Sequence, residues 1–316
     1  MDLHGKTLTI VYQFGKVAST SLVETLKANQ ALDVHQSHFL GESALQRIVP
    51  IAVDKATNGY FHGHLKGQLS ANLDLTYRMN RVLGGEGATP LKVISLSREP
   101  LNWLRSSILQ DIVGYRPDLL ALAAAGGVAT QNEDDDLRWA IEDVLSRTVD
   151  IIEKKGGFPS IVAEFLAEGG KGILSPVDAH LPPIVRKIFF LALRPHTWFD
   201  EHFRPCFGFG PEDFAPSAGI WTARQPRADF AILRYEDLDT HMATAFEFLG
   251  LGVPGALVRE NVSQTKAYAD VVRAAFSAPC AEVLRGHLAS SDYSKRFGYS
   301  GSDIEPKVPV KQLALD

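Results

Sequence analysis

Two short segments, separated by about eighty residues, constrain the fold of this chain more than any other feature. Residues 10–21 read Ile-Val-Tyr-Gln-Phe-Gly-Lys-Val-Ala-Ser-Thr-Ser, and residues 93–100 read Val-Ile-Ser-Leu-Ser-Arg-Glu-Pro. Each begins as a nearly continuous apolar run, which is typical of a strand buried on both faces. Each then passes through a polar turn into a segment with helical spacing. Repeated strand–turn–helix units predict an α/β domain.

The pattern along the chain predicts a three-layer α/β fold, with a central parallel β-sheet flanked by helices. We expect strands in the following ranges: 7–14, 59–65, 91–97 and 230–235. Helical spacing follows them, most clearly at 19–29, 101–111, 134–155 and 243–249. We expect a single domain over residues 1–300 with helical insertions at about 112–190, and an irregular C-terminal tail over residues 301–316.

Composition narrows the class of protein. The 316 residues are 45% hydrophobic and carry a formal net charge of −5, which does not favour binding to nucleic acid. Two cysteines give no disulfide framework and no zinc spacing, so no metal is expected. No export signal is visible, and no apolar run approaches the roughly 20 residues that span a bilayer. We expect a cytoplasmic protein without an integral membrane segment, whose oligomeric state the sequence leaves open.

The first turn has the chemistry of an anion site. Gly15-Lys-Val-Ala-Ser-Thr-Ser21 offers a point charge, small residues and three hydroxyls at the start of a helix, where unpaired N–H groups favour negative charge. It is not a Walker A loop, because Ile10 stands five residues before Gly15 and Lys16 is followed by Val17. The pattern therefore predicts an anion cradle without ATPase chemistry.

This turn resembles the 5′-phosphosulfate loop of sulfotransferases that use 3′-phosphoadenosine 5′-phosphosulfate (PAPS). That loop reads Pro-Lys-x-Gly-Thr-Thr or, in the carbohydrate branch, Lys-x-x-Ser-Thr-Ser. Lys16, Ser19, Thr20 and Ser21 match, whereas Gly15 replaces the usual proline and Ala18 the usual glycine. The resemblance implies the following cofactor-binding residues: Gly15, Lys16, Val17, Ala18, Ser19, Thr20 and Ser21. It also implies a catalytic role for Lys16, which would stabilise charge on the leaving group.

The second turn resembles the 3′-phosphate motif of the same family, Arg-Asp-Pro-x5-Ser. Arg98 and Ser106 stand at the expected separation, and Glu99 replaces the aspartate. An arginine at the end of a strand and a serine about two turns into the next helix can approach one phosphate from two sides. Arg98 and Ser106 are therefore predicted to bind the 3′-phosphate.

A third motif, Phe61-His-Gly-His-Leu65, lies between the two turns. It resembles a segment of the uronyl 2-O-sulfotransferase branch, in which the second histidine is the catalytic base. The resemblance implies that His64 is the base and that His62 orients the substrate or His64. Imidazole titrates near neutral pH and suits this role. A metal site is the weaker alternative, because two histidines at i and i+2 have no evident third ligand.

Further segments resemble a bacterial sulfotransferase-like family of capsular polysaccharide synthesis proteins: Trp198-Phe-Asp-Glu, Leu233-Arg-Tyr-Glu-Asp-Leu238 and Asn261-Val-Ser-Gln-Thr-Lys266. Together the resemblances imply a P-loop-like sulfotransferase fold and transfer of a sulfuryl group from PAPS to a hydroxyl, leaving 3′,5′-ADP. The acceptor would be a small molecule or glycan. Two alternatives remain open, a non-catalytic nucleotide-binding component of polysaccharide assembly and a nucleotide-dependent kinase.

Overall fold

The computed structural model describes residues 5–53, 62–86, 89–128, 130, 132–168, 173–174, 180–252 and 267–299. Within them the sheet has six strands in the order β2-β1-β3-β6-β5-β4. The strands are β1 (Thr7–Tyr12), β2 (Leu32–Ser37), β3 (Leu91–Ser97), β4 (Ala215–Ser217), β5 (Ile220–Gln225) and β6 (Ala228–Arg234). β2, β1, β3 and β6 run parallel, and β5 and β4 form an antiparallel edge.

Helices connect the strands and extend beyond them. Those before β4 are α1 (Ser19–Lys27), α2 (Glu42–Val53), α3 (His62–Leu83), α4 (Pro100–Ala125), α5 (Glu133–Lys154), α6 (Phe158–Glu168), α7 (Pro183–Trp198), the π-helical turn η2 (Phe199–Phe203), α8 (Arg204–Phe207) and η3 (Pro211–Asp213). Those after β6 are η4 (Tyr235–Asp237), α9 (Leu238–Leu249), α10 (Ala269–Ala275), α11 (Pro279–Ala289) and α12 (Asp292–Arg296).

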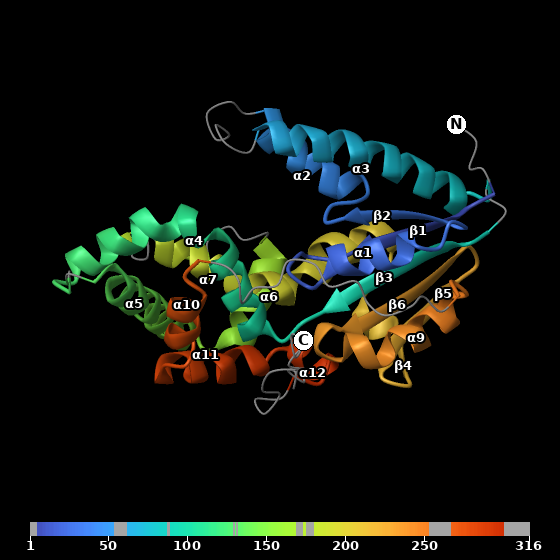
Figure 1. Ribbon diagram of the computed structural model, residues 1–316. Helices are drawn as coiled ribbons and strands as arrows, with labels where there is room; N and C mark the ends of the chain where they lie inside the picture. Colours follow the sequence, from blue (N-terminus) through green and yellow to red (C-terminus); the bar gives the residue numbers. More distant parts are fainter. Residues whose placement is uncertain are drawn as a thin grey trace, which may run out of the picture.

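The sheet is covered on both faces, and a group of helices stands beyond one of its ends (Figure 1). α1 and α9 pack on one face. On the other face Phe203 and Phe207 contact Phe230 of β6, with ring centroids 6.0 and 5.0 Å apart. The parallel strands point their C-terminal ends toward the helices α4, α5, α7, α10 and α11 (Figure 1). These helices therefore face the C-terminal ends of the strands, where ligands bind in open α/β sheets.

The predicted α/β class and the mostly parallel central sheet flanked by helices are confirmed. β1, β3 and β6 lie at the predicted positions, and their apolar side chains form the core, with Ile10, Ile94 and Ile232 at 0% exposure. β4 and β5 add an antiparallel edge to the parallel sheet, and the sequence did not indicate it. The predicted tail lies outside the described residues.

The predicted strand over residues 59–65 is wrong where the structure describes it, since His62 begins helix α3. The reason is the pattern of buried residues later in the same helix. Asn72, Leu75, Met79 and Val82 are buried at helical spacing, and they belong to one helix that runs from His62 to Leu83.

Helix α4 is longer than expected. Residues 112–125, expected to belong to a helical insertion, continue α4 itself, although Pro117 lies inside. Ile112, Tyr115, Leu119 and Leu122 are buried at helical spacing, and this packing offsets the lost hydrogen bond of the proline. No helix in the described ranges is long and apolar enough to cross a membrane.

Candidate functional site

The site begins with the order of the strands. β1 lies between β2 and β3, so the chain leaves β1 in one direction and later returns to its other side. Ligands of open α/β sheets bind at such a reversal, beyond the C-terminal ends of the two strands. The first predicted loop, Gly15–Ser21, follows β1, and Arg98 follows β3. The fold therefore places both predicted phosphate loops at the position that its topology favours.

The first loop has an unusual backbone. Gly15, Lys16 and Ala18 have positive φ angles of 86°, 59° and 59°. The left-handed region costs a residue with a Cβ roughly 1–2 kcal/mol, and such conformations cluster at functional sites. Ala18 is also the N-cap of α1 and makes no side-chain cap. The first N–H groups of α1 therefore face the loop without a capping side chain, as an anion site requires.

Side chains behind the first loop hold it in place. The N–H of Gly15 donates to Oε1 of Gln13, which is fully buried. Nδ1 of His38, the residue after β2, lies 2.7 Å from the carbonyl oxygen of Gln13. The turn is thus fixed from the side of β2, and His38 is a histidine beside the first loop that the sequence did not identify. His38 was missed because the strand that precedes it, β2, was not predicted.

The residues of the first loop differ in what they can offer. Val17 is fully buried and can present only its backbone, and Ser19 and Ser21 are 7% and 5% exposed. Lys16 is half-buried and Thr20 is exposed. A ligand at this loop would therefore meet backbone N–H groups, the lysine and the Thr20 hydroxyl first.

Two hydrogen bonds join the second turn to the first. Nη1 of Arg98 donates to the carbonyl oxygen of Lys16 at 2.5 Å. Nε1 of Trp103 donates to the carbonyl oxygen of Gly15 at 2.8 Å. The structure thus brings together two motifs that are far apart in the sequence and makes one site of them.

Arg98 is fixed by its surroundings. Its guanidinium carbon lies 4.2 Å from the ring centroid of Tyr235, and burial lowers its pKa. The hydroxyl of Tyr293 accepts from the N–H of Arg98 at 2.9 Å and donates to its carbonyl oxygen at 3.0 Å. Nε of Arg98 is buried and has no hydrogen-bond partner within the described part of the chain. An acceptor placed beside this buried donor would supply the hydrogen bond that it lacks.

Glu99, which replaces the aspartate of the family motif, is a helix cap. Its carboxylate accepts from the N–H groups of Leu101 and Asn102 at 3.2 and 2.7 Å. Its own N–H donates to Glu236 at 2.9 Å. Burial raises the pKa of both carboxyl groups. Glu99 and Glu236 therefore shape the second turn, and their contacts do not indicate a role in proton transfer.

Ser106 lies in the second turn of α4, one helical turn from Trp103 and on the same side of the helix. It is half-buried. The neighbouring Ser107 is 2% exposed, and its Oγ has no partner among the described residues. Since Trp103 reaches the first loop, this side of α4 faces the junction of the two turns.

His62 and His64 form the first turn of α3. Their side chains lie outside the described residues, so their roles stay predictions.

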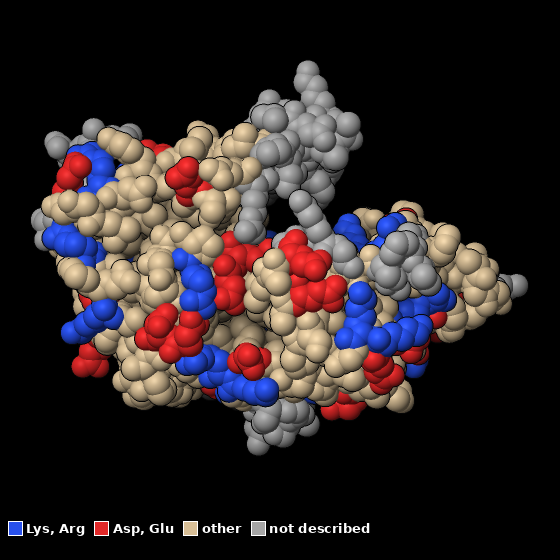
Figure 2. Space-filling model, turned by 180° about the vertical axis from the view of Figure 1, so that it is seen from behind, with Lys and Arg blue, Asp and Glu red and all other residues tan. Residues whose placement is uncertain are grey.

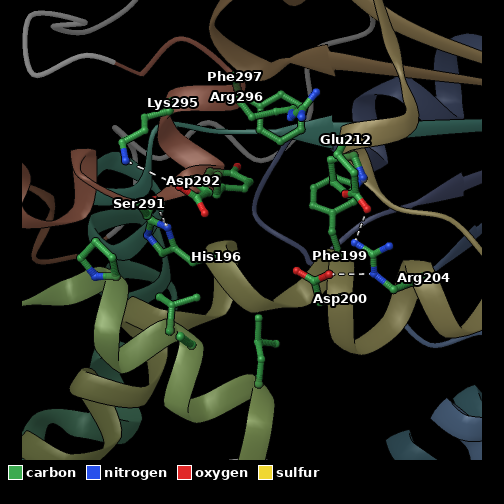
Figure 3. A pocket seen from close by; sticks show the side chains of 16 residues that line it. His196, Phe199, Asp200, Arg204, Glu212, Ser291, Asp292, Lys295, Arg296 and Phe297 are labelled. Atoms are coloured by element: carbon green, nitrogen blue, oxygen red, sulfur yellow. Dashed lines mark hydrogen bonds and ion pairs between the residues drawn. The ribbon is translucent and has the colours of Figure 1, made fainter.

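A separate pocket of about 660 Å³ is lined by residues of α6, α7, η2 and α12 (Figure 3). None of the predicted site residues lines it; Tyr293, which holds Arg98, is part of its wall. The face in Figure 2 shows acidic and basic side chains interspersed. Tyr293 therefore belongs to both regions: its hydroxyl bonds to Arg98, and the residue also lines the pocket.

Comparison with protein-family models, curated proteins and solved structures found no match to this chain. The case for a function therefore rests on the site itself.

Proposed function

We propose that this protein is a PAPS-dependent O-sulfotransferase. The observation that carries the proposal is the joining of the two phosphate-type loops at the strand reversal, through Arg98 to Lys16 and Trp103 to Gly15. A donor with phosphate groups at both ends needs two such anion sites at a fixed separation. The remaining elements, including a P-loop-like sulfotransferase fold, follow from the resemblance of the motifs.

The residues present fit the donor. The N–H groups at the start of α1, with Lys16, would hold the phosphosulfate end. The hydroxyl of Ser106 and Nε of Arg98, which has no partner among the described residues, would hold the 3′-phosphate. Trp103 is 2% exposed and bonded to Gly15, so it packs against the loop and does not stack on adenine.

PAPS supplies an activated sulfuryl group. A histidine, His64 in this proposal, takes the proton of the acceptor hydroxyl while the acceptor oxygen forms a bond to sulfur. The bond from sulfur to the phosphate oxygen breaks, and Lys16 stabilises the charge left on 3′,5′-ADP. Positioning and electrostatics supply most of the catalysis, as in phosphoryl transfer. The acceptor is a small molecule or glycan.

Thermal unfolding with 3′,5′-ADP tests the proposal. A ligand at 100 times its Kd adds about 2.7 kcal/mol to the free energy of unfolding. Lys16→Ala and Arg98→Ala should each remove this gain. Lys27→Ala is the matched control, because Lys27 is an exposed cation at the other end of α1, paired with Glu24 at 2.8 Å. Stabilisation by ATP with Mg²⁺ but not by 3′,5′-ADP would favour the kinase.

Turnover separates enzyme from binding component. Labelled PAPS and a panel of hydroxylated acceptors should give sulfated product with the parent protein. His64→Ala should keep the nucleotide-induced stabilisation and lose turnover. Turnover and stabilisation in His64→Ala are compared with those in His38→Asn, because His38 is the histidine beside the first loop. Nucleotide binding without turnover on any acceptor would favour the non-catalytic alternative.

A further inference from the structure

The pocket of about 660 Å³ has the composition of a ligand site (Figure 3). Sites for small organic molecules measure about 300–1,000 Å³ and combine an apolar lining with a few polar groups. One wall is a row on α6, consisting of Pro159, Val162, Ala163 and Leu166 at i, i+3, i+4 and i+7. Pro159, Ala163 and Leu166 of this row are exposed, whereas Phe158 and Ile161 of the same helix are buried in the core.

Aromatic rings form the opposite wall. Phe199, Tyr293 and Phe297 line the pocket, and the centroid of Phe297 lies 5.7 Å from that of Phe199 and 5.0 Å from that of Tyr293. Phe199 begins the π-helical turn η2, a rare element that is frequent at functional sites. The body of a ligand between these walls would be apolar.

One buried polar group lies in the wall. His196 is 5% exposed, and its Nδ1 lies 2.7 Å from Oγ of Ser291. Its Nε2 has no hydrogen-bond partner among the described residues. An unpaired buried polar atom costs about 1–3 kcal/mol, so a polar atom of a ligand here would be favoured.

The charged residues of the pocket lining differ in whether they have a partner of opposite charge. Arg204 contacts Asp200 at 2.9 Å and Glu212 at 2.6 Å, so two carboxylates more than offset its single charge. Lys295 lies 3.6 Å from Asp292, and within the described part of the chain Arg296 has no carboxylate partner. α12 thus contributes two exposed cations and one carboxylate, Asp292, to the pocket lining.

We propose that this pocket binds an organic anion with an apolar body, at a site separate from the two phosphate loops. The body lies between the α6 row and the aromatic wall, and the anionic group meets Lys295 and Arg296. This inference does not depend on the proposed sulfotransferase activity, because Arg98, Ser106 and residues 15–21 do not line the pocket.

Two fluorescent probes with the same body test the site: 1-anilinonaphthalene-8-sulfonate and the uncharged N-phenyl-1-naphthylamine. We expect each to bind the native chain at one site. Ala163→Trp should weaken both at least tenfold by filling the pocket, and since Ala163 is exposed the variant should fold. The double variant Lys295→Gln/Arg296→Gln should weaken the sulfonate about fivefold, the size of an exposed ion pair, and leave the amine unchanged.

Arg273→Gln is the control for general charge, since Arg273 is an exposed cation of α10 paired with Asp270. It should change neither probe. Lys16→Ala should leave both bound, which separates the pocket from the phosphate loops. Unchanged binding in Ala163→Trp, equal loss of both probes in the double variant, or loss of the sulfonate in Lys16→Ala would each overturn the proposal.

Discussion

The two-loop site and the pocket lie side by side, but backbone groups form the first and side chains form the second. At the loops, backbone groups and hydrogen bonds define the shape, as the bonds of Gly15 and Lys16 show. In the pocket, side chains from three stretches of the chain define the shape. A site made of backbone depends on the strand order beneath it, whereas one made of side chains can change with single substitutions. Tyr293 contributes to both, by its hydroxyl to the loops and by its position in the pocket wall.

The largest expected effect is on the loops. Trp103→Ala should lower the free energy of unfolding by about 3–5 kcal/mol, because it empties a buried aromatic site and leaves the Gly15 carbonyl without its donor. Urea unfolding measures this. Trp221→Ala, at a half-buried position of β5, is the control and should cost less. An equal loss in both would mean that Trp103 has no special part in joining the loops.

His196 in the pocket wall should make the protein less stable in acid. Burial lowers the pKa of His196 from 6.5 to about 3, so the folded state holds this imidazole neutral. The unfolded chain binds the proton first, and stability is lost as pH falls below 6.5. Between pH 6.5 and 4.5 the loss should reach about 1–3 kcal/mol.

His196→Gln tests this effect, because glutamine keeps a polar contact for Ser291 but does not titrate in this range. Chemical unfolding at several pH values should show a smaller acid loss in the variant than in the parent. Parallel pH profiles would exclude His196 as a source of the acid sensitivity.

Tyr293→Phe separates the two regions directly. It removes the hydroxyl that bonds to the N–H and carbonyl of Arg98 and retains an aromatic ring in the pocket wall. Stability should fall by about 1–2 kcal/mol, and stabilisation by 3′,5′-ADP should weaken. Binding of N-phenyl-1-naphthylamine should not change. If the probe is lost and the nucleotide is not, the hydroxyl supports the pocket instead of the loop.

The smallest effect tests the backbone character of the first loop. Ala18→Gly should raise the free energy of unfolding by about 0.5–1 kcal/mol, because φ is +59° at Ala18 and glycine adopts this region without strain. Ala121→Gly, at an exposed position inside α4, should instead lower it by about 0.5–1 kcal/mol. Thermal unfolding compares the two. A loss at both positions would contradict the inference that Ala18 is strained.

Prediction succeeded where a segment carried its own signal. β1, β3 and β6 are apolar runs buried on both faces, so their positions could be predicted without tertiary contacts. β2 reads Leu-Asp-Val-His-Gln-Ser and is half-exposed at the edge of the sheet, so its sequence lacked a strand pattern. His38 was missed with it. The false strand at 59–65 shows the converse, since a short β-type pattern yields to a long amphipathic helix.

The two phosphate loops were predicted as separate motifs, and the pocket was not predicted at all. Its lining comes from residues 159–166, 196–212 and 291–297, and no local pattern connects them. Such a cavity exists only through the angles at which helices meet. The same holds for Tyr293, whose bond to Arg98 spans 195 positions in the sequence.

The sequence by itself determined the α/β class, the three buried strands and the two anion-type turns, because strand burial and turn chemistry are local properties. Only the tertiary structure decided that these turns meet, since contact between them requires the order β2-β1-β3. It also decided that Nε of Arg98 has no partner among the residues that the structure describes, and that residues of α6, α7 and α12 line a second pocket. These features depend on packing between distant segments, which no pattern within one segment contains.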